Sequence, residues 1–292
     1  MTLSRFELFS PERLDEAVAL LKNKGKNTFV MAGGTDLLIQ HRHQIIHPQT
    51  IVSLKNISGL DHISFSRKKG LTIGATALLG TVAKHRTILK EYPAIAKAAG
   101  NTANVQIRNM GTVVGNLCNA SPAADNAPAL LALNAELNIT GPQGNRVLAL
   151  EDFFMGPGST ALQAAEIVTS IFVPTPPLAS GATYLHLSAR GRVDCSAAST
   201  GVLLSLKGLK VNDARIFIGA CGPTPLRMPK TEKKLTGNKI TKAIAEKAGL
   251  QASKESKPIS DVRANEDYRS QMVAVLVKRA IIEAHELARN NK

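Results

Sequence analysis

A glycine-rich stretch near the middle of the chain constrains its fold more than any other feature. Residues 111–131 read GTVVGNLCNASPAADNAPALL, with two glycines, three asparagines and a Ser-Pro pair before an Ala/Leu-rich segment typical of a helix. Glycine lets a backbone come close to a ligand because it has no Cβ. Amides gathered in such a turn form a concave anion site, and the start of a following helix reinforces it. The pattern predicts a phosphate-bearing cofactor held mainly by main chain.

A second stretch, Thr28–Leu38 (TFVMAGGTDLL), has a similar layout. Its apolar start predicts a buried strand, Gly33 and Gly34 form a turn, and Thr35-Asp36 stands where a helix N-cap is expected. Taken singly, each stretch fits a plain turn better than a ligand loop. Two of them in the first half of one chain favour the ligand loop. Neither matches the Walker sequence or the GxGxxG fingerprint.

Three segments carry a family resemblance: AGGTDLL at 32–38, TIGA at 72–75 and RNMGTVVGNLCNASPAAD at 108–125. Together they resemble the FAD-binding medium subunit of the molybdenum hydroxylases, the family of xanthine dehydrogenase and carbon monoxide dehydrogenase. The resemblance covers essentially the whole chain. It implies an α+β fold: an FAD-binding fold of the PCMH/vanillyl-alcohol-oxidase type, then a C-terminal α+β domain with a three-stranded antiparallel sheet and helices.

The chain divides into three predicted domains, 1–55, 56–175 and 178–292, the first two forming the FAD-binding fold. In the first, Ser10 as N-cap and Pro11 at N1 predict the start of a helix. The other predicted helices are 36–41, 78–84, 92–99, 127–133, 241–247 and 269–288. The predicted strands are 6–9, 28–32, 49–54, 62–66, 70–74, 135–140, 183–188, 197–206 and 215–219. Residues 166–173 are apolar and end at Pro174. The lysine-rich stretch 230–257 is expected at the surface.

The resemblance assigns cofactor-binding roles to two loops and a third short stretch. Residues 32–36 and 112–116 resemble the loops that clamp the FAD pyrophosphate, where amides donate and Thr35 and Thr112 add hydroxyls. The stretch Glu166–Val168 resembles one whose main chain meets the isoalloxazine ring. The predicted cofactor-binding residues are Val30, Met31, Ala32, Gly33, Gly34, Thr35, Asp36, Leu37, Thr112, Val114, Gly115, Asn116, Ser121, Asp125, Ile167, Val168 and His186. No catalytic residue and no metal ligand is predicted.

Two of the assigned roles have a structural alternative. Asp125 matches the acid that accepts hydrogen bonds from the ribityl or ribose hydroxyls of FAD, but it could instead cap the helix that follows it. Arg190 and Asp194 match a charged pair near the far edge of the flavin, or they form a surface ion pair that contributes little.

At three positions the sequence departs from the family pattern. Val114 replaces the usual first glycine of the T-x-G-G-N turn, and because valine disfavours positive φ, the turn is expected to adopt β-region dihedrals or to shift. His186 replaces the usual lysine. Thr102 stands where members that reduce NAD often have an aromatic residue. The electron acceptor therefore stays open between NAD, a quinone and oxygen.

The net charge of +14 favours acidic partners such as another subunit. Nucleic acid is not favoured, because the basic residues are scattered and aromatic residues make up only 4% of the chain. The three cysteines, Cys118, Cys195 and Cys221, are too widely spaced for a zinc site or an iron–sulfur cluster and fit a reducing cytoplasm. The histidines of HRHQIIH (41–47) are expected to be solvated rather than metal ligands. Neither a signal peptide nor a membrane-spanning segment is expected.

The resemblance implies an FAD-carrying electron-transfer subunit. Its expected partners are a large molybdopterin-binding subunit that holds the molybdenum cofactor and a small subunit with two [2Fe–2S] clusters, assembled as a dimer of heterotrimers. FAD would collect electrons from the clusters, while the protein orients the flavin and tunes its potential. Two alternatives stay open at this point: a stand-alone flavoprotein oxidoreductase, and an assembly subunit that has lost its flavin.

Overall fold

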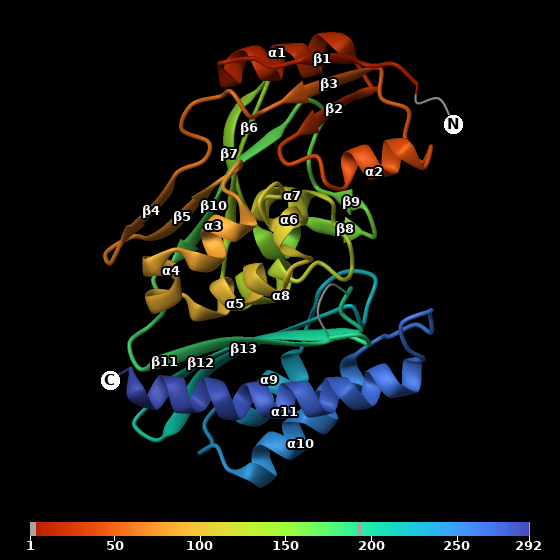
Figure 1. Cartoon of the computed structure of the whole chain (residues 1–292). Helices are drawn as coiled ribbons and strands as arrows, with labels where there is room; N and C mark the ends of the chain where they lie inside the picture. Colours follow the sequence, from red (N-terminus) through yellow and green to blue (C-terminus); the bar gives the residue numbers. More distant parts are fainter. Residues whose placement is uncertain (1–3, 192–193, 292) are drawn as a thin grey trace.

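The computed structural model describes residues 4–191 and 194–291, and Figure 1 shows the chain as stacked layers. A small sheet with one long covering helix lies at the N-terminal end. A five-stranded sheet and a group of short helices occupy the middle, and a second large sheet separates these helices from the long C-terminal helices. The observed layers agree with the predicted α+β class. The exact boundaries of the three predicted domains stay a prediction.

The N-terminal sheet is parallel, in the order β1 (Glu7–Phe9), β3 (Thr50–Ser53), β2 (Thr28–Met31). Helix α1 (Leu14–Lys24) packs against it through Ala17, Val18 and Leu21, which recur at helical spacing. The predicted helix start at Ser10 is wrong. Arg13 is extended, with φ −126° and ψ 146°, so the helix begins at Leu14.

Helix α2 (Leu37–Arg42) follows β2 and ends within the histidine-rich run at 41–47. His41 is buried, with Nε2 3.1 Å from the Ser4 carbonyl oxygen and its ring edge-on to Phe6. His41 was expected to be solvated, and that expectation is wrong because the imidazole packs on an aromatic ring. His43 and His47 are exposed, and the described residues contain no group of His, Cys, Asp and Glu that could hold a metal.

The middle sheet is antiparallel and five-stranded, and its central strand comes from the end of the region. Its order is β4 (Ile63–Ser66), β5 (Gly70–Gly74), β10 (Ile167–Pro174), β6 (Glu136–Gly141), β7 (Gly144–Ala149). The predicted β4–β5 hairpin is confirmed, with Ile63 opposite Ile73. A short hairpin, β8 (Phe154–Gly156) and β9 (Ser159–Thr160), follows the 3₁₀ turn η1 (Leu150–Asp152).

Six short helices lie between the two large sheets. They are α3 (Leu79–Lys84), α4 (Arg86–Glu91), α5 (Pro93–Asn101), α6 (Val105–Arg108), α7 (Val113–Cys118) and α8 (Asn126–Ala132). All residues of α8 are buried, which fits its composition of alanine, leucine, proline and one asparagine. Helices α4, α6 and α7 were not predicted from the sequence. Helices this short depend on tertiary packing more than on their own propensity.

The C-terminal sheet is antiparallel and has helices on both faces. Its order is β11 (Ser180–Leu187), β12 (Ala198–Lys207), β13 (Lys210–Gly219), β14 (Leu226–Arg227). Helices α5 and α8 contact one face, and α11 (Glu266–Asn290) contacts the other. Strand β12 is therefore buried from Ala198 to Leu206. The sequence predicted three strands here, and the structure adds the two-residue β14, which was too short to show a period.

The lysine-rich stretch is only partly at the surface. It forms α9 (Pro229–Leu235) and α10 (Lys242–Glu255). Thr231, Leu235 and Ala245 are buried, but every lysine of the stretch is exposed, as the sequence predicted. The lysines stay outside because α9 turns its apolar face toward β13 and α10 turns its apolar face toward α11.

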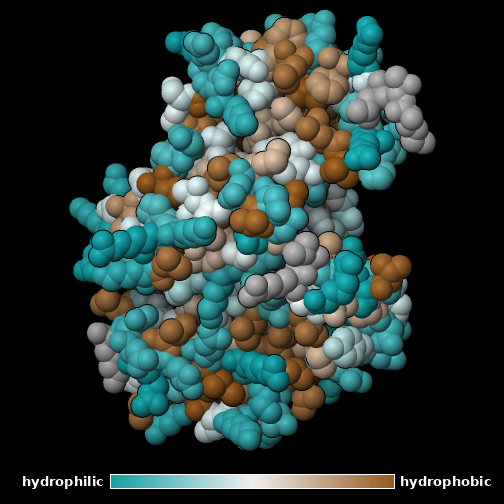
Figure 2. Space-filling view, in the orientation of Figure 1, coloured by the Kyte–Doolittle hydropathy of each residue, from teal (hydrophilic) through white to brown (hydrophobic). Residues whose placement is uncertain are grey.

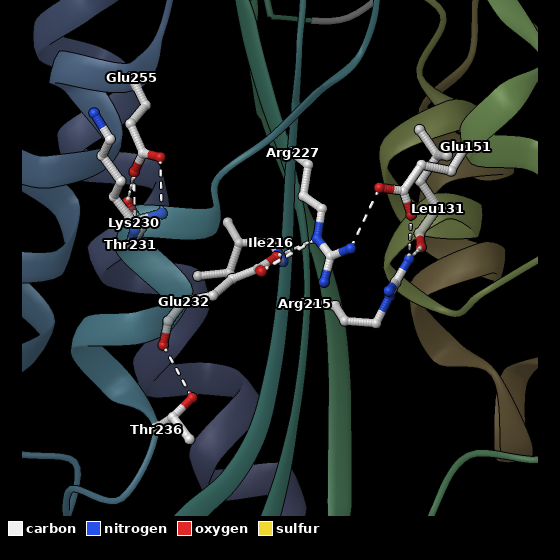
Figure 3. A network of polar contacts seen from close by, with 10 residues as sticks. All are labelled: Leu131, Glu151, Arg215, Ile216, Arg227, Lys230, Thr231, Glu232, Thr236 and Glu255. Carbon is white, nitrogen blue, oxygen red and sulfur yellow. Dashed lines mark hydrogen bonds and ion pairs between the residues drawn. The ribbon is translucent and has the colours of Figure 1, made fainter.

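Arginines of the C-terminal sheet join it to the middle region through Glu151 (Figure 3). Glu151 accepts hydrogen bonds from Arg215 at 3.0 Å and from Arg227 at 3.3 Å. Arg215 also donates to the Leu131 carbonyl oxygen at the end of α8, at 3.3 Å. Arg227 continues the network to Glu232 in α9, at 3.2 Å. These contacts fix α8 against the sheet by charge-assisted hydrogen bonds.

Hydrophilic residues cover most of the face in Figure 2, and hydrophobic side chains show as separate patches. Within the described residues, no helix is both long enough and apolar enough to cross a membrane.

Candidate functional site

A cavity of about 750 Å³ lies where the N-terminal sheet, the short helices and the start of β10 meet. Every predicted cofactor residue except His186 lines it. Arg190, Asp194 and Cys195, which belong to the C-terminal region, also line the cavity. Segments far apart in sequence thus form one site that is large enough for an extended cofactor.

The first loop offers free backbone donors to this cavity. Among the described residues, the amides of Gly33, Gly34, Thr35 and Asp36 donate to no carbonyl or side-chain acceptor of the protein. Unpaired amides in one turn are suited to the oxygens of a phosphate. Burial raises the pKa of the Asp36 carboxyl, so this group prefers a proton or a donor more than a free aspartate does.

The second loop is not the turn that the sequence predicted. Thr112 is the N-cap of α7, and its Oγ1 accepts a hydrogen bond from the Gly115 amide at 2.9 Å. Val114 lies inside the helix and is buried, so the expected β-region dihedrals are wrong. Helical dihedrals suit valine, because they have negative φ. Valine in place of the family's glycine therefore creates no backbone strain here.

Asn116 is oriented by a neighbour that sequence reasoning missed. Asn126 Nδ2 donates to Asn116 Oδ1 at 2.8 Å and to Thr102 Oγ1 at 3.1 Å. Thr102 in turn donates to the Ala98 carbonyl oxygen at 2.9 Å. With its oxygen occupied, Asn116 keeps its amide donors for a ligand in the cavity. Thr102 also lines the cavity, in the position where the sequence suggested a missing aromatic residue.

Asp125 does not cap the helix that follows it. Its side chain makes no capping hydrogen bond, so that interpretation is wrong. Instead Oδ1 accepts hydrogen bonds from the hydroxyls of Tyr184 and Ser196, both at 2.6 Å. Neither donor was predicted. They come from β11 and from the residues just before β12, and the local pattern around them indicates only strands.

His186 lies outside the cavity lining and next to these donors. Its Nδ1 is 3.2 Å from Ser196 Oγ, and its ring stacks on Tyr184 with centroids 6.1 Å apart. A direct contact with a ligand in the cavity is therefore not what the structure favours. His186 instead contacts Ser196 and Tyr184, the two residues that donate to Asp125.

Arg190 and Asp194 form an ion pair at 3.2 Å, and both line the cavity. The Arg190 side chain is exposed, while Asp194 also accepts hydrogen bonds from the amides of Arg190 and Cys195. The two side chains therefore satisfy each other at the edge of the cavity. Cys118 also lines the cavity, and burial raises the pKa of its thiol to about 12, so the thiol stays protonated.

Glu166 is held at the cavity wall by Arg146 of β7. The two side chains share a pair of parallel 2.7 Å hydrogen bonds, and Arg146 also donates to the Ala161 carbonyl oxygen at 3.0 Å. Ala165, just before Glu166, has a φ of 62°, a conformation that costs free energy in a non-glycine residue. Arg146 thus stabilises the strained turn that leads into Ile167 and Val168.

The Arg146–Glu166 pair predicts a pH dependence of stability. The Arg146 guanidinium holds the pKa of Glu166 below its ordinary value of 4.5. Because the folded pKa is lower than the unfolded one, the pair stabilises the fold above about pH 4.5 and loses its effect as pH falls through the folded pKa. We expect Glu166→Gln to lower Tm by about 2–4 °C at pH 7. This difference should shrink toward zero below the folded pKa.

Thermal melts of both proteins from pH 7 down to pH 3 measure this effect. Glu7→Gln is the matched control, because Glu7 pairs with Lys24 in an exposed position at 3.0 Å. Exposed pairs contribute little, so the control should move Tm by less than about 1 °C. If Glu166→Gln lowers Tm by the same amount at every pH, the charged Arg146–Glu166 pair is not the source of the lost stability.

The sequence matches two family models that together cover most of the chain. Residues 4–176 match the FAD binding domain in molybdopterin dehydrogenase, and residues 183–284 match the CO dehydrogenase flavoprotein C-terminal domain. The chain belongs to this family of FAD-binding subunits. The resemblance seen in the three sequence segments is confirmed.

Individual relatives agree over nearly their whole length. The carbon monoxide dehydrogenase medium chain of Afipia carboxidovorans is 31% identical, over 98% of both chains. The nicotine 6-hydroxylase medium subunit of Paenarthrobacter nicotinovorans is 30% identical, over 97% of this chain and 99% of the relative. Both are named as one subunit of a larger enzyme.

Solved structures confirm the fold. A chain of the reconstituted CO dehydrogenase from Oligotropha carboxidovorans superposes with a TM-score of 0.93 at 30% identity, covering 98% of this chain and 100% of that one. A chain of quinoline 2-oxidoreductase from Pseudomonas putida 86 gives 0.92 at 27% identity, with 99% of each chain covered. The same fold is therefore found in chains of a CO dehydrogenase and of a quinoline oxidoreductase.

Proposed function

We propose that this subunit binds FAD in the cavity and passes electrons from [2Fe–2S] clusters of a small partner subunit to NAD, a quinone or oxygen. The observation that supports this most is the meeting of the unpaired amides of residues 33–36 with the 112–116 segment in one cavity. Bound FAD would supply the redox chemistry, by accepting electrons singly and releasing them in pairs. The chain itself would bind and orient the flavin.

Each part of the cavity suits a different part of FAD. The amides of Gly33–Asp36, with the hydroxyls of Thr35 and Thr112, would hold the diphosphate. Asn116 and Ser121 would add polar contacts, and Asp125 would accept a hydrogen bond from a ribityl or ribose hydroxyl. The main chain of Ile167 and Val168 would meet the ring system. The described lining residues include no paired acid and base that would suggest a second, substrate-transforming site.

The complex that we propose contains a large molybdopterin-binding subunit and a small [2Fe–2S] subunit, as a cytoplasmic dimer of heterotrimers. The names of the relatives, "medium chain" and "medium subunit", support a multi-subunit enzyme. The net charge of +14 suits docking onto acidic subunit surfaces. The substrate would be transformed on the large subunit.

The test is to purify the protein with its copurifying chains, record the visible spectrum and identify the released cofactor. We expect flavin absorbance, FAD on release, and both a larger and a smaller partner chain. FAD without partners would favour a stand-alone oxidoreductase. No flavin, and none taken up when FAD is added, would overturn the proposal in favour of an assembly subunit that has lost its cofactor.

A further inference from the structure

A buried carboxylate joins the cavity to the C-terminal sheet. Asp125 is 7% exposed and stands directly before α8. A charged group in such a place is costly unless hydrogen-bond donors surround it. Two hydroxyls of the C-terminal region meet this need, because Tyr184 and Ser196 both donate to Oδ1 at 2.6 Å. The carboxylate of one region is thus held by the side chains of another.

The second oxygen of this carboxylate has no such partner. Among the described residues no donor reaches Asp125 Oδ2, and the residue lines the cavity. Asp125 Oδ2 is not one of the fully buried side-chain atoms that lack a hydrogen-bond partner in the described chain, so it is not shut off from the cavity. One oxygen of this carboxylate already accepts two hydrogen bonds, and the other is open to the cavity. The open oxygen is suited to accept a hydrogen bond from a hydroxyl of a ligand.

With Asp125 as the acceptor of both contacts, the donors of this network can be assigned in turn. Burial and the nearby Asp125 carboxylate raise the pKa of Tyr184 well above its ordinary value, so the phenol keeps its proton and donates. Ser196 has a single proton, which the 2.6 Å contact assigns to Asp125. Because the Ser196 proton goes to Asp125, the 3.2 Å contact between His186 Nδ1 and Ser196 Oγ is assigned with the imidazole N–H as donor. The order of donation is His186 to Ser196 to Asp125.

We propose that Tyr184 and Ser196 are positioning residues of the FAD site, which hold Asp125 so that Oδ2 accepts a hydrogen bond from a ribityl or ribose hydroxyl of the cofactor. This inference rests on the proposed function. It makes the C-terminal sheet a part of cofactor binding, through residues that do not line the cavity. It also gives His186 an indirect role, because its ring nitrogen donates to the Ser196 hydroxyl and orients it.

The first test measures FAD affinity of the deflavinated complex by flavin fluorescence. Loss of one hydrogen bond to a charged group predicts that Tyr184→Phe and Ser196→Ala each weaken FAD binding about 10-fold. The matched control is Tyr92→Phe. Tyr92 is equally buried, and its hydroxyl donates to the carbonyl oxygens of Val173 and Pro174 at 3.4 and 3.3 Å, away from Asp125. It should change the affinity less than 2-fold.

The second test asks whether Tyr184 acts through Asp125. In an Asp125→Asn background, Tyr184→Phe should change FAD affinity less than 2-fold, because the charged acceptor is gone. A full 10-fold loss in that background, or a wild-type affinity in Tyr184→Phe alone, would overturn the proposal. Melting temperatures of all variants separate general destabilisation from a binding effect. A wild-type complex that takes up no FAD would instead contradict the proposed function itself.

Discussion

Alanine in place of Gly33 is expected to weaken FAD binding about 100-fold or more. A Cβ at this position would lie 2.2 Å from the Met110 carbonyl oxygen and 2.7 Å from Gly111 Cα. Both are backbone atoms that cannot swing aside, so the two cofactor loops would have to separate. A displacement of about 1 Å in a preorganised site is enough for an effect of this size. Fluorescence titration of the deflavinated complex with FAD measures the loss.

The control for this substitution is Gly156→Ala in the β8–β9 hairpin. An added Cβ there meets nothing within 4 Å, and the residue does not have positive φ. Its FAD affinity should equal that of the wild type. If Gly33→Ala binds FAD within about 3-fold of the control, the two loops do not depend on their close contact, and the proposed diphosphate site is wrong.

Gly201→Ala is expected to lower the free energy of unfolding by about 3 kcal/mol or more, because overpacking against backbone leaves no side chain to repack. Gly201 lies in β12, where α8 crosses the sheet. Its Cβ would come within 2.1 Å of the Pro128 carbonyl oxygen and 2.8 Å of the Ala129 amide nitrogen. Helix α8 would have to leave the sheet. Urea denaturation followed by circular dichroism measures the change in the free energy of unfolding.

A second glycine tests whether contact, and not the residue type, decides this result. Gly100 lies in α5, and a Cβ there would have only Ala83 Cβ nearby, at an ordinary 3.8 Å. Gly100→Ala should therefore stabilise the protein by about 0.5–1 kcal/mol, the difference in helix propensity. A Gly→Ala substitution is thus expected to lower the free energy of unfolding at position 201 and to raise it at position 100. A destabilisation of Gly201→Ala below about 1 kcal/mol would show that α8 does not pack as closely as described.

The sequence predicted most of the regular elements, because they follow from local periodicity. The strand, Gly-Gly turn and helix at 28–42 formed as expected, and so did the β4–β5 hairpin and the three long strands of the C-terminal sheet. It failed at α1, whose start lies at Leu14 instead of the Ser-Pro signal, and at Val114. In both places the backbone follows its packing instead of the strongest local signal.

The sequence alone identified most of the residues that line the cavity, because the two glycine-rich loops match the pattern of the family. Tertiary structure alone decided how those residues are held. Tyr184 and Ser196 reach Asp125 across separations of 59 and 71 residues, and Arg146 reaches Glu166 across 20. A local pattern reports on neighbours within a few residues, through the periods of helices and strands. Contacts between distant residues depend on how sheets and helices pack, and only the folded chain brings a buried carboxylate and its two hydroxyl donors together.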